Sequence, residues 1–229
     1  MNASPPQSRF FALIPSAGHG SRAGGDGPKQ YRAVAGKPMV EHTLAAFAGV
    51  ARLAATLVVV APGDTTMPPG ASYSIAECGG STRAATVLNG LQALRAQGAG
   101  EADWVLVHDA ARCLITAALV DKLIDACAGD AVGGLLAHPL ADTLKMEEGG
   151  RVTATLPREA KWLAQTPQMF RLGLLVQALQ AAGDQVTDEA GAVEALGHKP
   201  LLVPGGAQNF KVTYPDDFAL ADAVLRSRQ

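Results

Sequence analysis

Apolar runs of strand length alternate with amphipathic stretches of helical length along the first part of the chain. Five runs predict strands, and they cover residues 10–14, 55–61, 73–76, 104–108 and 131–136. The stretches between them carry an apolar face and capping residues, and they predict helices over residues 38–48, 81–97 and 116–128. Strands that alternate with helices of this length are typical of parallel βαβ units. The pattern therefore predicts an α/β fold with a doubly wound, mostly parallel sheet.

The alternation breaks after this region. Two short polar strands around Gly149 and Gly150 predict a protruding β-hairpin arm over about residues 139–160. Because an isolated hairpin is only marginally stable in water, we expect the arm to pack against a second copy of the chain. The remaining pattern predicts an extended stretch over 162–170, helices over 171–182 and from 187, strands near 201–203 and 210–212, and a last helix after Pro215. Without a linker or internal repeat, we expect one domain over residues 1–229.

Composition narrows the class of protein. The chain has 229 residues, of which 48% are hydrophobic, and its net charge is only -2. A nucleic-acid surface would need a basic excess, so any anion site must be local. The polar start and the short apolar runs predict neither a signal peptide nor a membrane span. Three widely spaced cysteines favour neither a disulfide framework nor a zinc site, so we expect a reduced, cytoplasmic enzyme.

A glycine-rich loop follows the first predicted strand. Five glycines lie between Gly18 and Gly27, and Arg22 and Lys29 lie in or beside this loop. Such a loop exposes consecutive backbone N–H groups, which suit phosphate oxygens. The alternative is a dinucleotide-binding fingerprint, but that motif must open a helix, and here the segment from Gly24 to Pro28 opposes helix formation. The loop therefore predicts a polyphosphate cradle, with a solvated surface loop as the plainer alternative.

Three segments should meet at the carboxyl edge of the sheet: the loop over 15–29, residues 79–83 and residues 108–112. Asp109 directly follows a strand there, and a carboxylate beside a polyphosphate cradle is a natural ligand for Mg²⁺. Its alternative role is to bond a nearby loop or helix amide. His108 is expected to be a packed histidine rather than a base. The sequence therefore predicts a metal-assisted phosphate site at this edge.

Several further polar residues are weaker candidates, because each alone is more often structural. They are Arg83, Thr86, Arg112, Thr166 and Lys211. No constellation for covalent catalysis accompanies them. Cations, a glycine cradle and a metal-type carboxylate are the parts that transfer a phosphoryl or nucleotidyl group by positioning and charge stabilisation.

Together these motifs resemble the 2-C-methyl-D-erythritol 4-phosphate cytidylyltransferase family of the non-mevalonate isoprenoid pathway. The resemblance rests on the segments IPSAGHGSRAGGDGPKQY, GGSTRAATVLNGL, VLVHDAARCL, HPLADTLK, PREAKWLAQTPQMF, VTDEAGAVE and NFKVTYPDDFALA, which span nearly the whole chain. It implies a Rossmann-like nucleotidyltransferase fold whose hairpin arm serves dimerisation. The implied reaction is transfer of CMP from CTP to methylerythritol phosphate with release of pyrophosphate.

The resemblance also implies roles for single residues. Arg22 and Lys29 would be catalytic by stabilising the pentacoordinate phosphorus, and Asp109 would bind Mg²⁺ or another divalent cation. Nucleotide-binding positions would be Pro15, Ser16, Ala17, Gly18, Gly20, Gly80, Ser81, Thr86 and Ala110. Substrate-binding positions would be Arg112, Thr166 and Lys211, with Thr143 and Arg158 coming from the arm of the partner subunit in a homodimer. Neither nucleic acid nor membrane is an expected partner.

The chain departs from the family pattern at a few positions. Cys113 replaces a usual proline, Ser81 lies where acidic or other polar residues are common, and Thr86 replaces a serine but keeps the hydroxyl. None of these removes a charged catalytic group. Two alternatives stay open: a cytidylyltransferase acting on ribitol 5-phosphate, and a non-catalytic nucleotide-binding module.

Overall fold

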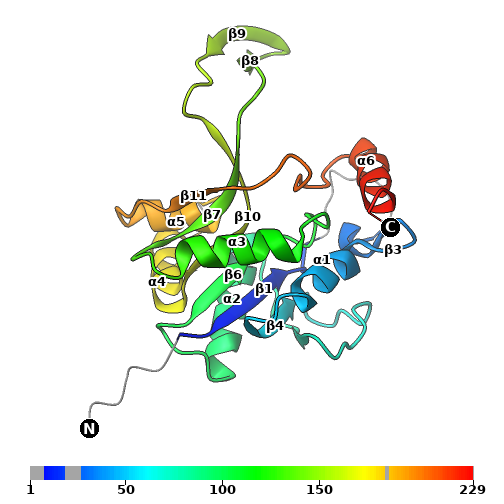
Figure 1. Ribbon diagram of the computed structural model, residues 1–229, viewed down its shortest axis with the longest axis vertical. Helices are drawn as coiled ribbons and strands as arrows, with labels where there is room; N and C mark the ends of the chain where they lie inside the picture. Colours follow the sequence, from blue (N-terminus) through cyan, green and yellow to red (C-terminus); the bar gives the residue numbers. More distant parts are fainter. Residues whose placement is uncertain (1–7, 19–26, 184–185, 229) are drawn as a thin grey trace.

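The computed structural model describes residues 8–18, 27–183 and 186–228. Within these ranges the central sheet has seven strands: β1 (Phe10–Pro15), β4 (Leu53–Val59), β5 (Ser74–Ala76), β6 (Trp104–Val107), β7 (Gly133–Pro139), β10 (Trp162–Arg171) and β11 (Leu201–Pro204). Their order is β11-β7-β10-β6-β1-β4-β5 (Figure 1). Neighbouring strands are parallel, except that β10 is antiparallel to both β6 and β7. The predicted α/β fold with a mostly parallel sheet is confirmed.

Helices cover both faces of this sheet. One face packs against α1 (Met39–Ala48) and α3 (Ala117–Cys127), and the other packs against α2 (Arg83–Ala96), α4 (Leu172–Ala182) and α5 (Glu189–Ala195). Strand β1 serves both layers because successive side chains point to opposite faces. Its Phe11 and Leu13 join the cluster with α2, α4 and α5, whereas Ala12 and Ile14 join the cluster with α1 and α3.

The strand order reverses at β1. The chain continues from β1 to β4 on one side, and β6 lies on the other side, so the carboxyl ends of β1 and β6 are neighbours. In an open α/β sheet, ligands bind in the crevice at such a switch point. The topology alone therefore predicts a ligand-binding site just beyond Pro15 and Val107.

Small elements beside this region form a third core. They are a 3-10 helix η2 (Lys29–Tyr31), the strand pair β2 (Ala33–Val34) and β3 (Lys37–Pro38), and the last helix α6 (Pro215–Arg226). Buried Val34 and Met39 pack in one cluster with Val212 and Ala221. This packing brings the segment before α6 next to the segment after the glycine-rich loop.

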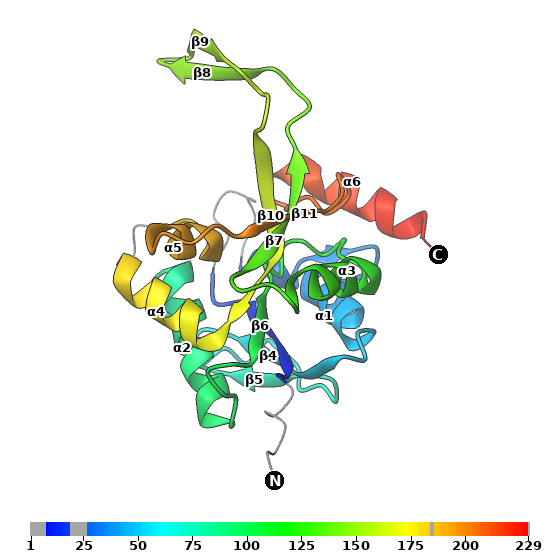
Figure 2. The same cartoon turned by 60° about the vertical axis from the view of Figure 1, so that its left-hand side comes forward.

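The hairpin arm projects from the body of the molecule (Figures 1 and 2). It consists of β8 (Leu144–Glu148) and β9 (Arg151–Leu156), which form an antiparallel sheet of their own. The turn uses Gly149 and Gly150 with φ of 59° and 78°, where glycine avoids steric strain. Met146 is 49% exposed and Val152 is 64% exposed. The predicted hairpin is confirmed, and its use in dimerisation stays a prediction.

Three details of the sequence prediction were wrong. Residues 210–212 are not a strand, because Val212 uses its backbone N–H on the Ala111 carbonyl and its carbonyl on Lys29 instead of a sheet ladder. The cap of α2 is Thr82 rather than Ser81, since the Thr82 side chain accepts from the Ala85 N–H. Two strands, β4 and β7, are also displaced by about two residues from their predicted ranges. No helix in the described ranges is both long and apolar enough to cross a bilayer.

Candidate active site

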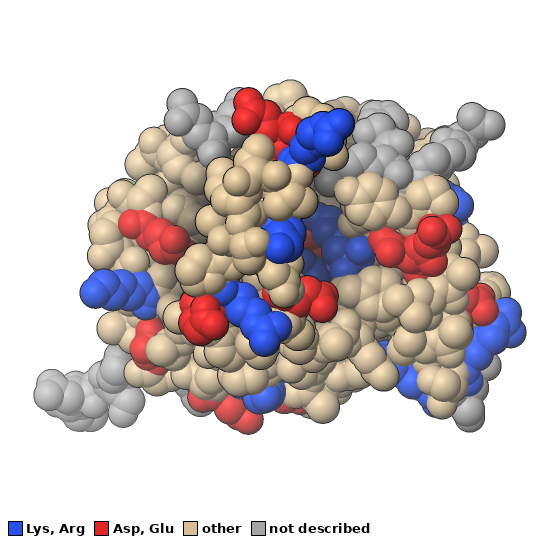
Figure 3. All heavy atoms as spheres, turned by 90° about the horizontal axis from the view of Figure 1, so that it is seen from above, with Lys and Arg blue, Asp and Glu red and all other residues tan. Residues whose placement is uncertain are grey.

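A cavity of about 500 Å³ opens at the switch point of the sheet. The segments that line it come from five parts of the chain: residues 15–18, 29–30, 61–62, 79–83 and 109–111, joined by Thr86 and Lys211. In the space-filling view from the end of the arm, positively charged side chains lie inside a recess (Figure 3). The predicted meeting of the three edge segments is thus confirmed for their described residues.

The floor of the cavity is made of closely approaching main chain. Strand β1 continues past Pro15, because the Ser16 N–H donates to the Val59 carbonyl at 2.7 Å. Next to it, the Gly79 N–H donates to the Val60 carbonyl at 2.8 Å. A Cβ at position 79 would lie 2.3 Å from the Ala17 Cβ, so only glycine fits. The Ser16 hydroxyl is buried beside the cavity and bonds to no group in the described part of the chain, which leaves it available to a ligand.

Thr86 fixes the neighbouring loop. Its hydroxyl accepts from the Gly80 N–H at 3.0 Å and donates to the Thr82 carbonyl at 2.9 Å. Sequence reasoning assigned this hydroxyl to the nucleotide directly. The structure places Thr86 and Ser81 on the cavity wall, and the Thr86 hydroxyl holds the loop that would meet the ligand.

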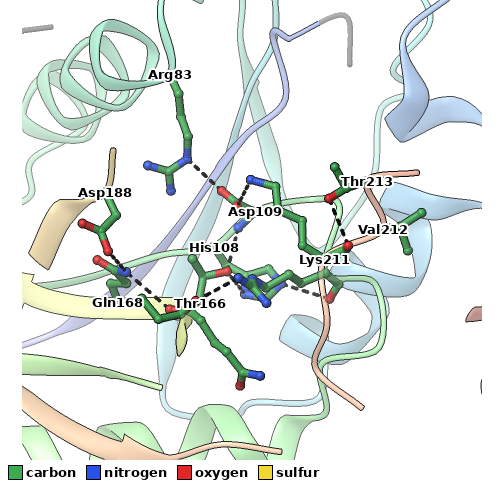
Figure 4. Close-up of polar contacts among 12 residues, drawn as sticks. Arg83, His108, Asp109, Thr166, Gln168, Asp188, Lys211, Val212 and Thr213 are labelled. Carbon is green, nitrogen blue, oxygen red and sulfur yellow. Dashed lines mark hydrogen bonds and ion pairs between the residues drawn. The ribbon is translucent and has the colours of Figure 1, made fainter. Parts of the chain in front are cut away.

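Four charged residues form an ion-pair cluster beside the cavity, which we call the Asp109 cluster: Arg83, Asp109, Glu189 and Lys211. Arg83 Nε donates to Asp109 Oδ1 at 2.8 Å, and Lys211 Nζ lies 2.7 Å from Asp109 Oδ2. The two cations therefore approach the carboxylate from different elements (Figure 4). Arg83 also forms a bidentate pair with Glu189, at 2.7 and 3.0 Å.

Electrostatics keep this carboxylate ionised. Burial alone would raise the pKa of Asp109, but the adjacent charges of Arg83 and Lys211 outweigh burial and hold that pKa far below its ordinary value. Burial likewise disfavours the positive form of Arg83, but Glu189 and Asp109 raise the pKa of its guanidinium. Asp109 is therefore an anion and Arg83 a cation at neutral pH.

His108 is a packed residue, as predicted, and not a base. Burial lowers the pKa of His108 to about 3. Its Nδ1 accepts from the Thr166 hydroxyl at 3.1 Å, and its Nε2 donates to the Arg112 carbonyl at 3.3 Å. The Thr166 hydroxyl in turn accepts from the Asp109 N–H at 3.1 Å. The neutral imidazole thus helps to fix the backbone at Asp109.

A second, smaller cavity of about 200 Å³ adjoins the first. Both cavities are lined by Arg83, Asp109 and Lys211, and the smaller one adds Arg112 and Thr166. The three predicted acceptor residues of the chain body, Arg112, Thr166 and Lys211, are therefore together. The Arg112 guanidinium donates to the Asn209 carbonyl at 2.7 Å and to the Ala164 carbonyl at 3.1 Å, which holds it against this cavity.

The remaining predicted residues have three different outcomes. Lys29 lines the larger cavity and donates from Nζ to the Val212 carbonyl at 2.8 Å. Thr143 and Arg158 lie exposed at the base of the arm and line neither cavity, and Arg158 donates to the Ala141 carbonyl. Gly20 and Arg22 lie outside the described residues.

The donor set suits only certain metals. The described ranges contain no group of three or more His, Cys, Asp or Glu side chains that could hold a metal ion. Among the described residues that line the larger cavity, Asp109 is the single carboxylate. Mg²⁺ needs one or two protein carboxylates when phosphate oxygens and water complete its shell. An ionised Asp109 beside a cavity of about 500 Å³ fits that requirement. The described residues do not provide a site built entirely of protein ligands.

Residues 10–227 match a family model described as 2-C-methyl-D-erythritol 4-phosphate cytidylyltransferase (IspD). The chain belongs to this family. A relative named 2-C-methyl-D-erythritol 4-phosphate cytidylyltransferase, from Ralstonia nicotianae, is 54% identical over 97% of the chain and 94% of its own length. A crystal structure of a 4-diphosphocytidyl-2C-methyl-D-erythritol synthase is 41% identical, with a TM-score of 0.84 over 95% of the chain and 99% of its own.

Another cytidylyltransferase relative is longer. It is named bifunctional enzyme IspD/IspF, comes from Albidiferax ferrireducens, and is 66% identical over 97% of the present chain. The chain spans 55% of the length of that relative. A solved cytidylyltransferase from Thermus thermophilus is 37% identical, with a TM-score of 0.80 over 95% of the chain and 99% of its own.

Sequence reasoning missed several polar residues of this cytidylyltransferase site. Gln30 donates to the Ser16 carbonyl at 2.6 Å, and Asn209 donates to the Thr166 carbonyl at 2.9 Å. Glu189 is 0% exposed and bonds to Arg83. Glu189 lies in the segment VTDEA, where a glutamate in the first turn of a helix is expected simply to stabilise the helix dipole. Only the fold brings Glu189 next to Arg83, which lines both cavities.

Proposed function

We propose that this chain transfers CMP from CTP to 2-C-methyl-D-erythritol 4-phosphate and releases pyrophosphate. The observation that carries the proposal is the pair of adjoining cavities that share the ionised Asp109 and its two cations. Two anionic substrates must meet where their charges are offset, and this arrangement provides such a place. Membership in the cytidylyltransferase family supports the choice of reaction.

The larger cavity is the proposed nucleotide site. An oxygen of the acceptor phosphate attacks the α-phosphorus of CTP, and the bond from that phosphorus to the bridging oxygen breaks, so that pyrophosphate leaves with the electron pair. Lys29 at the cavity wall, with Arg22, would stabilise the negative charge of the pentacoordinate state. The nucleotide itself would contact the residues predicted to bind it: Pro15, Ser16, Ala17, Gly18, Gly20, Gly80, Ser81, Thr86 and Ala110.

Asp109 is the proposed ligand for Mg²⁺ or another divalent cation. When bound, the metal supplies charge neutralisation at the triphosphate oxygens. Asp109 is available as an anion because its pKa is held far below the ordinary value. Its two oxygens already face Arg83 and Lys211, so a metal would have to take over at least one of these contacts.

The smaller cavity is the proposed acceptor site. Arg112 and Lys211 supply positive charge, and Thr166 supplies a hydroxyl at its wall. A phosphate monoester is already ionised at neutral pH, so the reaction needs no general base, which agrees with a buried, neutral His108. Thr143 and Arg158 would complete the acceptor site from the arm of a partner subunit, in a homodimer. The exposed apolar side chains of the arm, Met146 and Val152, support such a contact.

A reduced, cytoplasmic location is part of the proposal, supported by the three free cysteines Cys78, Cys113 and Cys127. Burial raises the pKa of the Cys113 thiol to about 11, so this thiol is inert rather than catalytic.

A coupled pyrophosphate assay tests the reaction. With CTP and Mg²⁺, we expect pyrophosphate release when methylerythritol phosphate is added and little release with ribitol 5-phosphate. Faster pyrophosphate release with ribitol 5-phosphate would identify that compound as the acceptor in place of methylerythritol phosphate. CTP binding without pyrophosphate release in the presence of either acceptor would favour a nucleotide-binding module and would contradict the proposed activity.

A further inference from the structure

Glu189 has no part in the reaction as proposed, yet it is the most deeply buried charge near the site. Its side chain is 0% exposed, and its described partner is Arg83, which it meets through both carboxylate oxygens at 2.7 and 3.0 Å. A buried carboxylate is costly unless it is paired and hydrogen-bonded. A fold would rarely keep such a charge for packing alone, since an apolar residue of similar volume is often as stable there.

The surrounding contacts fix where Glu189 points. Gln168 of β10 donates to Asp188 Oδ2 at 2.9 Å and accepts from the Ala190 N–H at 2.7 Å. Asp188 also caps the start of α5 by accepting from the Gly191 N–H at 2.9 Å. These bonds hold the residues on both sides of Glu189 against the central sheet. The segments TPQ and VTDEA are therefore joined, and Glu189 is held next to Arg83.

Arg83 then links Glu189 to the proposed metal ligand. Two nitrogens of its planar guanidinium face Glu189, while Nε faces Asp109 at 2.8 Å. The rigid fork makes these contacts mutually dependent, because rotation away from one carboxylate changes the geometry at the other. The Asp109 cluster contains two cations and two carboxylates, so its formal charges cancel. Without Glu189 the same cluster would carry one net positive charge.

We infer that Glu189 is a positioning residue, which holds Arg83 and shares its charge so that Asp109 can exchange a side-chain cation for a divalent metal. The inference rests on the proposed function, because it takes Asp109 as the metal ligand. If Glu189 were neutral, Asp109 would be the one carboxylate left to Arg83 within the cluster. Arg83 would then compete more strongly with the metal for Asp109.

The test measures CTP binding to the full chain by calorimetry, at a series of Mg²⁺ concentrations. For Glu189→Gln, which keeps the shape of the side chain, we expect the half-saturating Mg²⁺ concentration to rise by about tenfold, as is typical when an outer partner of a metal ligand is removed. Glu194→Gln makes the same change at an exposed position on the same helix, and it should leave the Mg²⁺ dependence unchanged.

A double variant separates positioning from a structural role. In Arg83→Gln/Glu189→Gln both charges of the buried pair are absent, so the competing cation is gone and the Mg²⁺ requirement should return to the unmodified level or below. This double variant also decides the question if the single variant does not fold, because it leaves neither partner of the pair unpaired.

Three outcomes are informative. A folded Glu189→Gln chain with an unchanged Mg²⁺ requirement would overturn the inference, and so would a loss that the double variant does not restore. If the unmodified chain itself shows no Mg²⁺-dependent CTP binding, the proposed function fails instead, so the two failures are distinguishable.

Discussion

Gly79 illustrates, at the scale of a single residue, how the site depends on close backbone approach. The position where a Cβ would be built lies 2.3 Å from the Ala17 Cβ and 2.8 Å from the Val60 carbonyl oxygen. Real Cβ atoms do not approach so closely, so a side chain there must move one wall of the nucleotide cavity. The glycine is thus required by space and not by an unusual backbone angle.

For Gly79→Ala we expect a loss of about 1–3 kcal/mol in the free energy of unfolding, as for other overpacked positions. CTP affinity should fall as well, because the displaced wall contains the Gly80 N–H and the Ser16 hydroxyl. Thermal unfolding and calorimetric CTP titration measure the two effects. Gly129→Ala is the matched control, since a Cβ at that position meets open space. Equal behaviour of the two variants would argue against close packing at Gly79.

Single residues differ in how far sequence could predict their roles. The position of Asp109 at the cavity was predictable because it directly follows a strand at the carboxyl edge of the sheet, and its role as a metal ligand stays a prediction. Glu189 was not, because the residue that pairs with it, Arg83, is 106 positions away in the sequence and meets it only through the fold. Thr86 was assigned to the right wall, but whether its hydroxyl bonds the loop or the ligand depends on geometry that spacing does not encode.

Strands β1 and β6 are tied together at the scale of secondary-structure elements, at the end of the sheet far from the site. Asp103, just before β6, accepts from the Arg9 N–H at 2.9 Å and from the Arg9 guanidinium at 2.6 Å. It also accepts from the Gly100 N–H at 2.8 Å. Burial by itself would raise the pKa of Asp103, but these bonds lower it below its ordinary value of 3.8.

Because the folded state lowers the pKa of Asp103, this carboxylate stabilises the fold above about pH 4, and the contribution is lost as the pH falls through the lowered pKa. Asp103→Asn should therefore reduce the free energy of unfolding at pH 7 by about 1–3 kcal/mol. It should also flatten the loss of stability below pH 4. Denaturant unfolding across pH 2–7 measures both, and the exposed Asp142→Asn is the control. An unchanged acid profile in Asp103→Asn would contradict this account.

Elements were predictable where local patterns agree with the fold. Buried strands such as β6 and capped helices such as α3 follow from periodicity and from the Thr116 cap. The segment over 210–212 misled the prediction, because an apolar alternating run has no ladder partner when its backbone groups serve the site. The antiparallel direction of β10 was also not evident, since direction depends on the path of the arm that precedes it.

The arm is the feature that matters at the scale of the whole molecule. It projects from the body, and its predicted acceptor residues, Thr143 and Arg158, line neither cavity of their own chain. The proposed site, completed by the arm of a partner subunit, would account for both observations. Sequence could predict that the hairpin exists, but local patterns in one chain do not show what the hairpin packs against.

Mixing two inactive variants tests this shared site. Arg22→Ala and Arg158→Ala should each have little activity, because each removes a cation from every site. After subunit exchange, half of the dimers are mixed, and one of the two sites in each mixed dimer has both arginines. The recovered activity should therefore be about a quarter of the unmodified level. No recovery despite demonstrated exchange would mean that the two residues act within one chain.

The central claim is that the cavity at the switch point holds a nucleotide triphosphate beside Asp109. A crystal structure with CTP and Mg²⁺ measures this most directly. We predict that the triphosphate lies against residues 15–18 and 79–81, that Asp109 holds the metal, and that Lys29 and Arg22 face the α-phosphate. A triphosphate bound elsewhere, with Lys29 and Arg22 turned into bulk solvent, would contradict the account.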